Sequence, residues 1–424
     1  MGKARETRTG VDGTALFRPQ GLQLPGSPRD QGSARDLRGT FAWVCSLIGV
    51  LGSAGLPSGC AREVPDGNGN GADVVPPSEP TRGTPFNDAS TAPQDEANDS
   101  PANYDCAKSG PLDAPPELGC TGYFAPGSRT SLGEGVRDYE PAVTLYSDGA
   151  DKKRWVFLPK GQKIDTKDPN AWVFPVGTKF WKEFSLQGKR IETRYYAKVD
   201  AGRWVGTTYR WNGKETVAKR LRSGERNVGG MAYNVPNEVH CDSCHAGSSD
   251  RTLGFEAVGL GLPEAKGLTL EILVNEGLLS DPPARTKFRL PEDTTGKAGP
   301  ALGWLHANCG TACHNRGDQS EATYLGLFLR LDAKALIAAG DAPMDARKTD
   351  TFLTNVDQAP RMPAFVGAPG TKRIVPGRSD LSELYALVSL PKDSPVNTMP
   401  PVGTLTHDTH GMAVLKAWID AMKP

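Results

Sequence analysis

The residues at 241–245, Cys-Asp-Ser-Cys-His, have the types and the spacing needed for covalent attachment of a c-type haem. In such a motif each cysteine sulfur bonds one vinyl group of the porphyrin, and the histidine that follows is held against the iron as its proximal ligand. We therefore expect Cys241 and Cys244 to hold a haem c and His245 to bind its iron. A CxxC disulfide or half of a zinc site is the alternative for the same residues.

A second cluster, Cys-Gly-Thr-Ala-Cys-His at 309–314, has three residues between its cysteines instead of two. The extra residue must bulge outward for both sulfurs to reach the vinyl carbons, which a loop containing glycine permits. We expect Cys309 and Cys313 to hold a second haem c, with His314 as the proximal ligand.

The sequence after the second cluster predicts the parts of a small cytochrome c. Residues 380–390 are expected to form a helix with an acidic first turn, and Asp408 is expected to cap a terminal amphipathic helix. Met399 lies between them in a Pro-rich loop, and its thioether is the expected distal ligand of the second haem. Ligation by His and Met raises the reduction potential. A packed loop methionine is the other reading of Met399, and Met362 is the competing candidate for the iron.

The first haem has no evident distal ligand. His240 adjoins Cys241 on the attachment side, so we do not expect it to reach the opposite face of the porphyrin. The remaining candidates are His306, His407, His410, Met231 and Met344. The first haem is therefore the better place to look for an open iron site.

The charge and the composition bound the class of protein. The chain has 424 residues with 49 basic and 49 acidic side chains, which allows two domains or three small ones and leaves no net charge. A nucleic-acid partner normally needs a basic face, so we expect none. No nucleophile with an adjacent base, phosphate loop or pair of catalytic carboxylates is recognisable, so an electron carrier is favoured over a catalyst and the question of enzymatic activity stays open.

The N-terminal residues 1–60 predict an export signal. Arg35 and Arg38 precede an apolar run at 41–51, and small residues lead to Cys60. The residues Leu-Pro-Ser-Gly-Cys that end at this cysteine resemble a bacterial lipobox, although Pro stands where Leu is preferred. We expect Cys60 to be lipidated and the protein to lie in the periplasm or at the cell surface, tethered to a membrane. The long polar stretch ahead of the run leaves a misassigned start codon open.

An oxidising compartment permits disulfides. If Cys45 leaves with the signal, Cys60 carries lipid and the two clusters hold haem, only two of the 8 cysteines remain. These are Cys106 and Cys120, which form a natural pair that closes a Pro/Gly-rich loop.

The rest of the chain predicts an α+β protein with several domains. Residues 61–103 are expected to be a disordered acidic linker, because they cannot bury enough apolar surface to offset their conformational entropy. Residues 104–236 are expected to form an antiparallel β domain of the sandwich or barrel type. A first haem-motif region at 237–295 and an all-α cytochrome c-like domain at 296–424 follow.

The strand signals within the β domain are alternation and turns. Apolar residues alternate along 189–199, and residues 203–211 continue as a second strand after a turn. Asn212-Gly213 is then a strong hairpin signal, and earlier runs at 154–159 and 179–186 look similar. The tryptophans of this region are expected to pack the core, with an aromatic ligand platform as the alternative.

Four stretches resemble a family of bacterial exported proteins described as predicted di-haem c-type cytochromes with an N-terminal β-rich region. They are Thr-Leu-Tyr-Ser-Asp-Gly-Ala-Asp-Lys-Lys-Arg at 144–154, Phe-Pro-Val-Gly-Thr-Lys-Phe at 174–180, Leu-His-Ala-Asn-Cys at 305–309 and Met-Pro-Pro at 399–401. The resemblance covers the chain from about Cys120 to its end. It implies two covalent haems, electron transfer and a periplasmic or cell-surface location. The family's second motif usually has two residues between its cysteines, so the three found here are a departure.

Three readings of the function follow. The first is an electron carrier that relays electrons between periplasmic or membrane redox partner proteins. The second is a haem-dependent oxidoreductase, peroxidase-like or associated with a dehydrogenase, whose β domain binds substrate. The third has a structural disulfide or zinc at each cysteine cluster and a binding role for the β domain.

Overall fold

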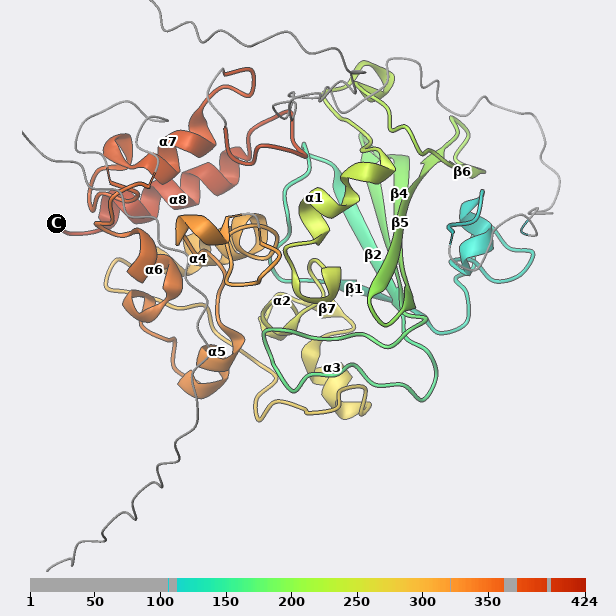
Figure 1. Ribbon diagram of the computed structural model, residues 1–424, viewed down its shortest axis with the longest axis horizontal. Coiled ribbons are helices and arrows are strands. Elements are labelled where there is room, and N and C mark those ends of the chain that lie inside the picture. The colour runs from blue at the N-terminus through green and yellow to red at the C-terminus, as the bar shows by residue number, and fades with distance from the viewer. Residues whose placement is uncertain (1–105, 107–112, 321, 362–371, 395–397) are drawn as a thin grey trace, which may run out of the picture. The chain divides into compact units, whose positions relative to one another are not determined.

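Figure 1 shows the computed structural model of the chain, which describes residue 106 and residues 113–320, 322–361, 372–394 and 398–424. The predicted export signal, the lipidation site Cys60, the linker at 61–103 and Met362 lie outside the described residues. Within the described ranges, no helix is both long and apolar enough to cross a membrane.

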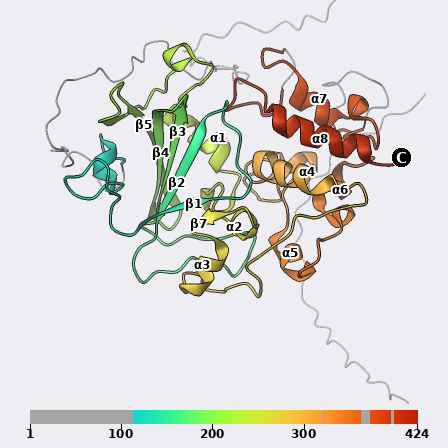
Figure 2. The ribbon, with the colours of Figure 1, turned by 180° about the vertical axis from the view of Figure 1, so that it is seen from behind.

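Seven antiparallel strands form one sheet in the order β6-β5-β4-β3-β2-β1-β7 (Figures 1 and 2). Their bounds are β1 Val136–Glu140, β2 Asp151–Phe157, β3 Lys179–Leu186, β4 Lys189–Asp200, β5 Arg203–Trp211, β6 Ala218–Arg220 and β7 Lys266–Gly267. The strands predicted at 179–186 and 203–211 begin and end at the predicted residues. The described strands share this single sheet and do not form the two facing sheets of a sandwich. Helices and loops, not a second sheet, cover both of its faces.

One face of the sheet packs against the segment that precedes β1. Trp181, Tyr209 and Trp211 are almost fully buried there in a cluster with Leu118 and Tyr123. The Trp181 indole N–H donates to the Thr121 hydroxyl at 2.9 Å, which satisfies the one polar atom that this ring buries. Core packing is therefore the role of these two tryptophans. A disulfide joins Cys106 to Cys120 beside this segment.

The opposite face of the sheet is buried under the chain that follows β6. Phe180 and Tyr196 on this face belong to a large hydrophobic core that continues through Phe255 to Leu415 and Trp418 near the C-terminus. The alternation of residues 189–199 predicts one buried face, yet both faces are covered.

Eight α-helices are described. The described part of the chain after residue 296 contributes helices but no strand to the sheet. They are α1 Cys241–His245, α2 Ala257–Gly261, α3 Leu270–Asn275, α4 Ala298–Leu305, α5 Ala333–Ala339, α6 Asp350–Asn355, α7 Glu383–Ser389 and α8 Thr409–Ala421. The antiparallel sheet and these helices confirm the α+β class. The helix predicted at 380–390 is divided into a 3₁₀ turn and α7, because Ser382 between them is extended and its hydroxyl accepts the Val375 N–H.

The terminal helix α8 forms as predicted and packs on α4. One carboxylate oxygen of Asp408 accepts the Gly411 N–H at 2.9 Å and caps the helix. The other accepts the indole N–H of Trp304 on α4 at 2.7 Å. The capping residue therefore also fixes the position of α8 against α4.

Candidate functional site

The first cysteine motif forms α1, which lies on the face of the sheet that carries Tyr196. The Asn237 side chain accepts the His240 N–H and caps the 3₁₀ turn that leads into the helix. A side-chain carbon built on Gly206 of β5 would lie 3.3 Å from the Cys241 sulfur, so the motif rests directly on this strand. The His245 ring lies 4.5 Å from the Tyr196 ring between centroids, and Tyr196 stacks on Trp204.

The surroundings of His245 hold its imidazole neutral. Its Nδ1–H donates to the Arg251 carbonyl at 2.7 Å, which leaves Nε2 as the ring nitrogen with a lone pair. Part of the ring is accessible, yet the surrounding protein excludes enough water to lower its pKa to about 3, and Lys182 acts in the same direction. A neutral imidazole with an oriented lone pair is the form that binds a metal.

The second cysteine motif continues α4 through a π-helical turn at His306–Gly310. The Thr311 N–H donates to the His306 carbonyl and the His314 N–H to the Cys309 carbonyl, each at 2.9 Å and each spanning five residues. A π turn accommodates one residue more than an α-helical turn. The extra residue of the motif is therefore accommodated by these wide turns, which begin in the π-helical turn and continue in the turn at 311–314.

Gly310 and His314 lie in close packing at the end of this turn. A side-chain carbon on Gly310 would lie 2.5 Å from the Arg330 nitrogen, so only glycine fits. His314 is 9% exposed, and burial lowers its pKa to about 4 while the Leu327 carbonyl opposes that shift. Its Nδ1 nevertheless makes no hydrogen bond of normal geometry. A buried imidazole with an unused ring nitrogen fits the role of a metal ligand.

The two motifs are in backbone contact. A side-chain carbon on Gly247, two residues after the first motif, would lie 2.0 Å from the Ala312 carbonyl oxygen in the second. The Asn315 amide donates to the Gly247 carbonyl at 3.0 Å and to the Gly310 carbonyl at 2.9 Å. Sequence reasoning missed this contact. Two sequence signals could have suggested it: Gly247, which follows His245 by two residues, and the amide of Asn315, which directly follows His314.

All four motif cysteines are thiols in the structure. Burial raises the pKa of Cys241 to about 11, and burial together with Cys313 raises that of Cys309 to about 12. Within the described ranges, no group of three or more His, Cys, Asp or Glu side chains is arranged to hold a metal ion. Cys241 and Cys309 are therefore protonated at neutral pH.

Met399 is partly buried between α7 and α8. Its N–H donates to the Leu387 carbonyl of α7 at 2.9 Å, and its side chain packs against the same hydrophobic core as Cys309. The competing Met362 is not described. The structure thus holds the backbone of Met399 to the helical half of the chain, beside the core that the second motif also contacts.

His306, a candidate distal ligand of the first haem, already uses both of its ring nitrogens. Its Nδ1 accepts the Leu331 N–H at 3.0 Å, and its Nε2 lies 3.3 Å from a carboxylate oxygen of Glu256. It is therefore a structural residue, and the expectation that it could bind iron is wrong.

The other four candidates are dispersed. The Nε2 of His407 donates to the Leu390 carbonyl at 2.8 Å, and His410 is exposed. Met231 and Met344 pack against two different hydrophobic clusters.

The turn at 147–151 holds the loop that follows Met399. One Asp148 oxygen accepts the backbone N–H groups of Leu405 and Thr406, each at 2.8 Å. The Tyr146 N–H donates to the Asn308 side chain at 2.7 Å, and its hydroxyl bonds the Thr406 hydroxyl. Two of the stretches that carry the family resemblance, 144–154 and 305–309, therefore meet at the second motif, and the first of them also holds the loop that follows 399–401.

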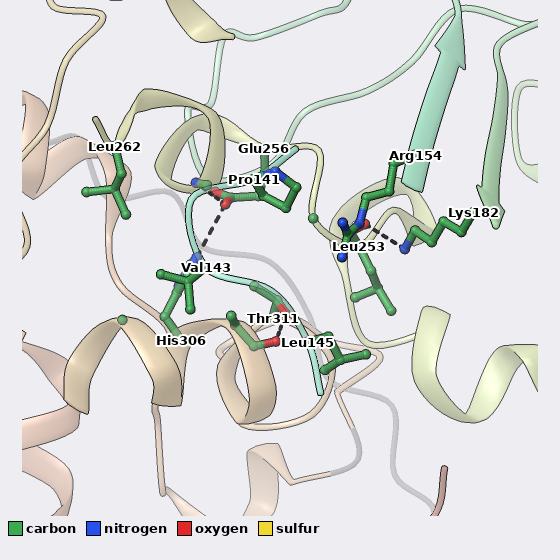
Figure 3. Close-up of a pocket in the computed structure, with 14 residues that line it drawn as sticks. Pro141, Val143, Leu145, Arg154, Lys182, Leu253, Glu256, Leu262, His306 and Thr311 are labelled. Atoms are coloured by element: carbon green, nitrogen blue, oxygen red, sulfur yellow. Dashed lines mark hydrogen bonds and ion pairs between the residues drawn. The ribbon is translucent and has the colours of Figure 1, made fainter. Parts of the chain in front are cut away.

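A cavity lies between the sheet and the second motif (Figure 3). Arg154 and Lys182 reach it from β2 and β3, and His306 and Thr311 reach it from the second motif. Glu256, also in the wall, accepts the Val258 and Gly259 N–H groups and thereby caps α2. No pattern in the sequence indicated this cavity.

Comparison of the chain with protein-family models, with curated proteins and with solved structures finds no match.

Proposed function

We propose that the chain is a c-type cytochrome with two covalently attached haems that transfers electrons in the periplasm or at the cell surface. The observation that carries this proposal is the contact of Gly247 with Ala312 and Asn315, which brings two cysteine motifs, each followed by a neutral imidazole, to one place. Two unrelated disulfide or zinc clusters have no need of this contact. A carrier with two redox centres requires them to be neighbours.

In this proposal each residue has a definite task. Cys241 and Cys244 hold one porphyrin, and Cys309 and Cys313 hold the other. The bound iron supplies a one-electron couple. His245 and His314 present neutral nitrogens because burial opposes their protonation.

We also propose that residues 296–424 form a cytochrome c-like domain. The proposal is supported by α4, which leads into the second motif, by its packing on the terminal helix α8, and by Met399 in the loop between α7 and α8. Met399 is the proposed distal ligand. Lipidation at Cys60, the export signal and a periplasmic or membrane redox partner rest on the sequence alone.

Haem counting tests the proposal. The full chain is matured in a bacterial periplasm, and a haem-stained denaturing gel and a pyridine haemochrome spectrum give the number of haems per chain. We expect two haems, one fewer in Cys244→Ala and one fewer in Cys313→Ala. Cys106→Ala, which breaks the disulfide outside both motifs, should retain two. A wild-type chain with no covalent haem would refute the proposal, and bound zinc would favour the third reading.

The second candidate function is a haem-dependent oxidoreductase. The observation that favours it is His306, whose two ring nitrogens are both engaged, so that this residue cannot close the first iron. An open ferric site would give a high-spin signal that changes with cyanide or peroxide. A low-spin spectrum that ignores both reagents would leave the carrier as the function.

A further inference from the structure

Three basic residues stand directly opposite one another across the sheet. Arg154 of β2 pairs in register with Lys182 of β3, and Lys182 pairs with Arg194 of β4. Like charges at directly opposed positions of antiparallel strands destabilise the sheet. A row of this kind on a buried face is relieved by negative charge or by loss of a proton, and burial, together with Arg154 and Arg194, lowers the pKa of Lys182 to about 7.

Only one end of this row has a carboxylate partner. The Arg194 guanidinium donates to both oxygens of the fully buried Glu192, at 2.7 to 3.1 Å. The Lys182 ammonium donates to the Leu253 carbonyl at 2.9 Å, a neutral partner. Since an ammonium has three N–H groups, this bond leaves donors for a further ligand.

Arg154 has no such partner at all. It is 5% exposed, and among the described residues its guanidinium makes no hydrogen bond and no ion pair. Burial lowers its pKa, and Tyr139 and Glu140 oppose that shift only through space. A mostly buried guanidinium without an acceptor is costly, because burial removes most of the water that its N–H groups would otherwise bind.

Both side chains line the cavity between the sheet and the second motif, as Figure 3 shows. The carboxylate already in its wall, Glu256, is occupied by the cap of α2 and by His306. The first motif is close by, since His245 bonds the Arg251 carbonyl and Lys182 bonds the Leu253 carbonyl two residues further on.

We propose that Arg154 and Lys182 bind a carboxylate in this cavity. A planar guanidinium matches the two oxygens of a carboxylate, and the neighbouring ammonium adds a second charge. The carboxylate has two sources with the same chemistry: a propionate of the haem at the first motif, which rests on the proposed function, or a small free carboxylic acid that acts as a ligand.

The test uses the full chain matured in a periplasm, with Arg154→Met and Lys182→Met as the variants. Lys153→Met is the matched control, because it removes the same charge from the same strand at an exposed position. Arg154→Lys retains the charge and guards against a fold defect. Haem content, the two reduction potentials and the thermal midpoint in acetate at constant ionic strength are measured for each.

A propionate source predicts that Arg154→Met and Lys182→Met retain two haems while one potential falls. Removing a cation near the iron disfavours the reduced state by about tenfold, which is about 59 mV for one electron. A free carboxylate source predicts unchanged potentials and a midpoint that acetate raises in the wild type but not in Arg154→Met.

The proposal is overturned if acetate has no effect and both variants match Lys153→Met in their potentials. Its failure is distinguishable from that of the proposed function. A chain without haem refutes the cytochrome, while the acetate titration still decides whether the cavity binds a carboxylate.

Discussion

Met399 is the proposed distal ligand; in the structure its N–H donates to the Leu387 carbonyl of α7 and its side chain packs partly buried against the core. If its sulfur is the distal ligand, Met399→Ala should remove the thioether-to-iron absorption band. The variant should also lower one reduction potential, because ligation by His and Met raises the potential of a haem. Met412→Ala is the control, since this methionine also packs against the core. A band that survives in Met399→Ala would exclude this residue as the ligand.

His314 should make the haem-free chain sensitive to acid. Burial lowers its pKa from 6.5 to about 4, so between these values the unfolded chain binds a proton that the folded chain does not. The free energy of unfolding should therefore fall as the pH drops from 6.5 to 4, by on the order of 3 kcal/mol for this group. His245 acts in the same direction.

Urea unfolding at several pH values measures this dependence. His314→Gln should flatten it, whereas His410→Gln, a change at an exposed position, should leave it as it is. Equal slopes in both variants would contradict the assignment to His314.

At the scale of elements, the contact between α4 and α8 depends on Asp408. Asp408→Ala removes the cap of α8 and leaves the Trp304 indole N–H without its acceptor, which should cost about 2–3 kcal/mol in the free energy of unfolding. Asp408→Asn retains an oxygen for one of these bonds and should cost less. Denaturant titration compares the two variants, and equal losses would show that the hydrogen bonds of Asp408 do not stabilise the helix pair.

Elements with a local cause could be predicted from the sequence. β3 and β5 follow from period-two alternation and hairpin turns, and α8 follows from its cap and its apolar stripe. The π turn of the second motif could not be predicted in this way, because either a loop or a helical turn can accommodate an inserted residue. The packing of Gly310 against Arg330, which no local pattern reveals, favours the helix.

At the scale of the whole molecule, the sequence did not predict that the face of the sheet with Phe180 and Tyr196 is covered. Arg194 alternates with apolar residues as on a solvated face, yet chain from beyond residue 240 packs on this face, where Phe255 joins the core and the Leu253 carbonyl accepts from Lys182. Single residues of the two motifs were recognisable from their types and spacing. Their meeting was not, because it depends on contacts between segments distant in sequence.

The contact between the two motifs gives the last prediction. Gly247→Ala would place a carbon 2.0 Å from the Ala312 carbonyl oxygen, so the backbones must separate. The overpacking should cost about 1–3 kcal/mol in stability. If the chain carries the two proposed haems, both should remain attached, since no cysteine or histidine is altered, but the electrostatic interaction between the two centres should weaken as they move apart.

Redox titration measures that interaction as the effect of one centre's oxidation state on the potential of the other. Gly202→Ala is the control, because a side-chain carbon there meets no atom within 4 Å. If Gly247→Ala retains the full interaction between the centres while it loses stability, the contact holds the fold together without coupling the haems. A weakened interaction with both haems in place would make this junction the route by which the two motifs work as one unit.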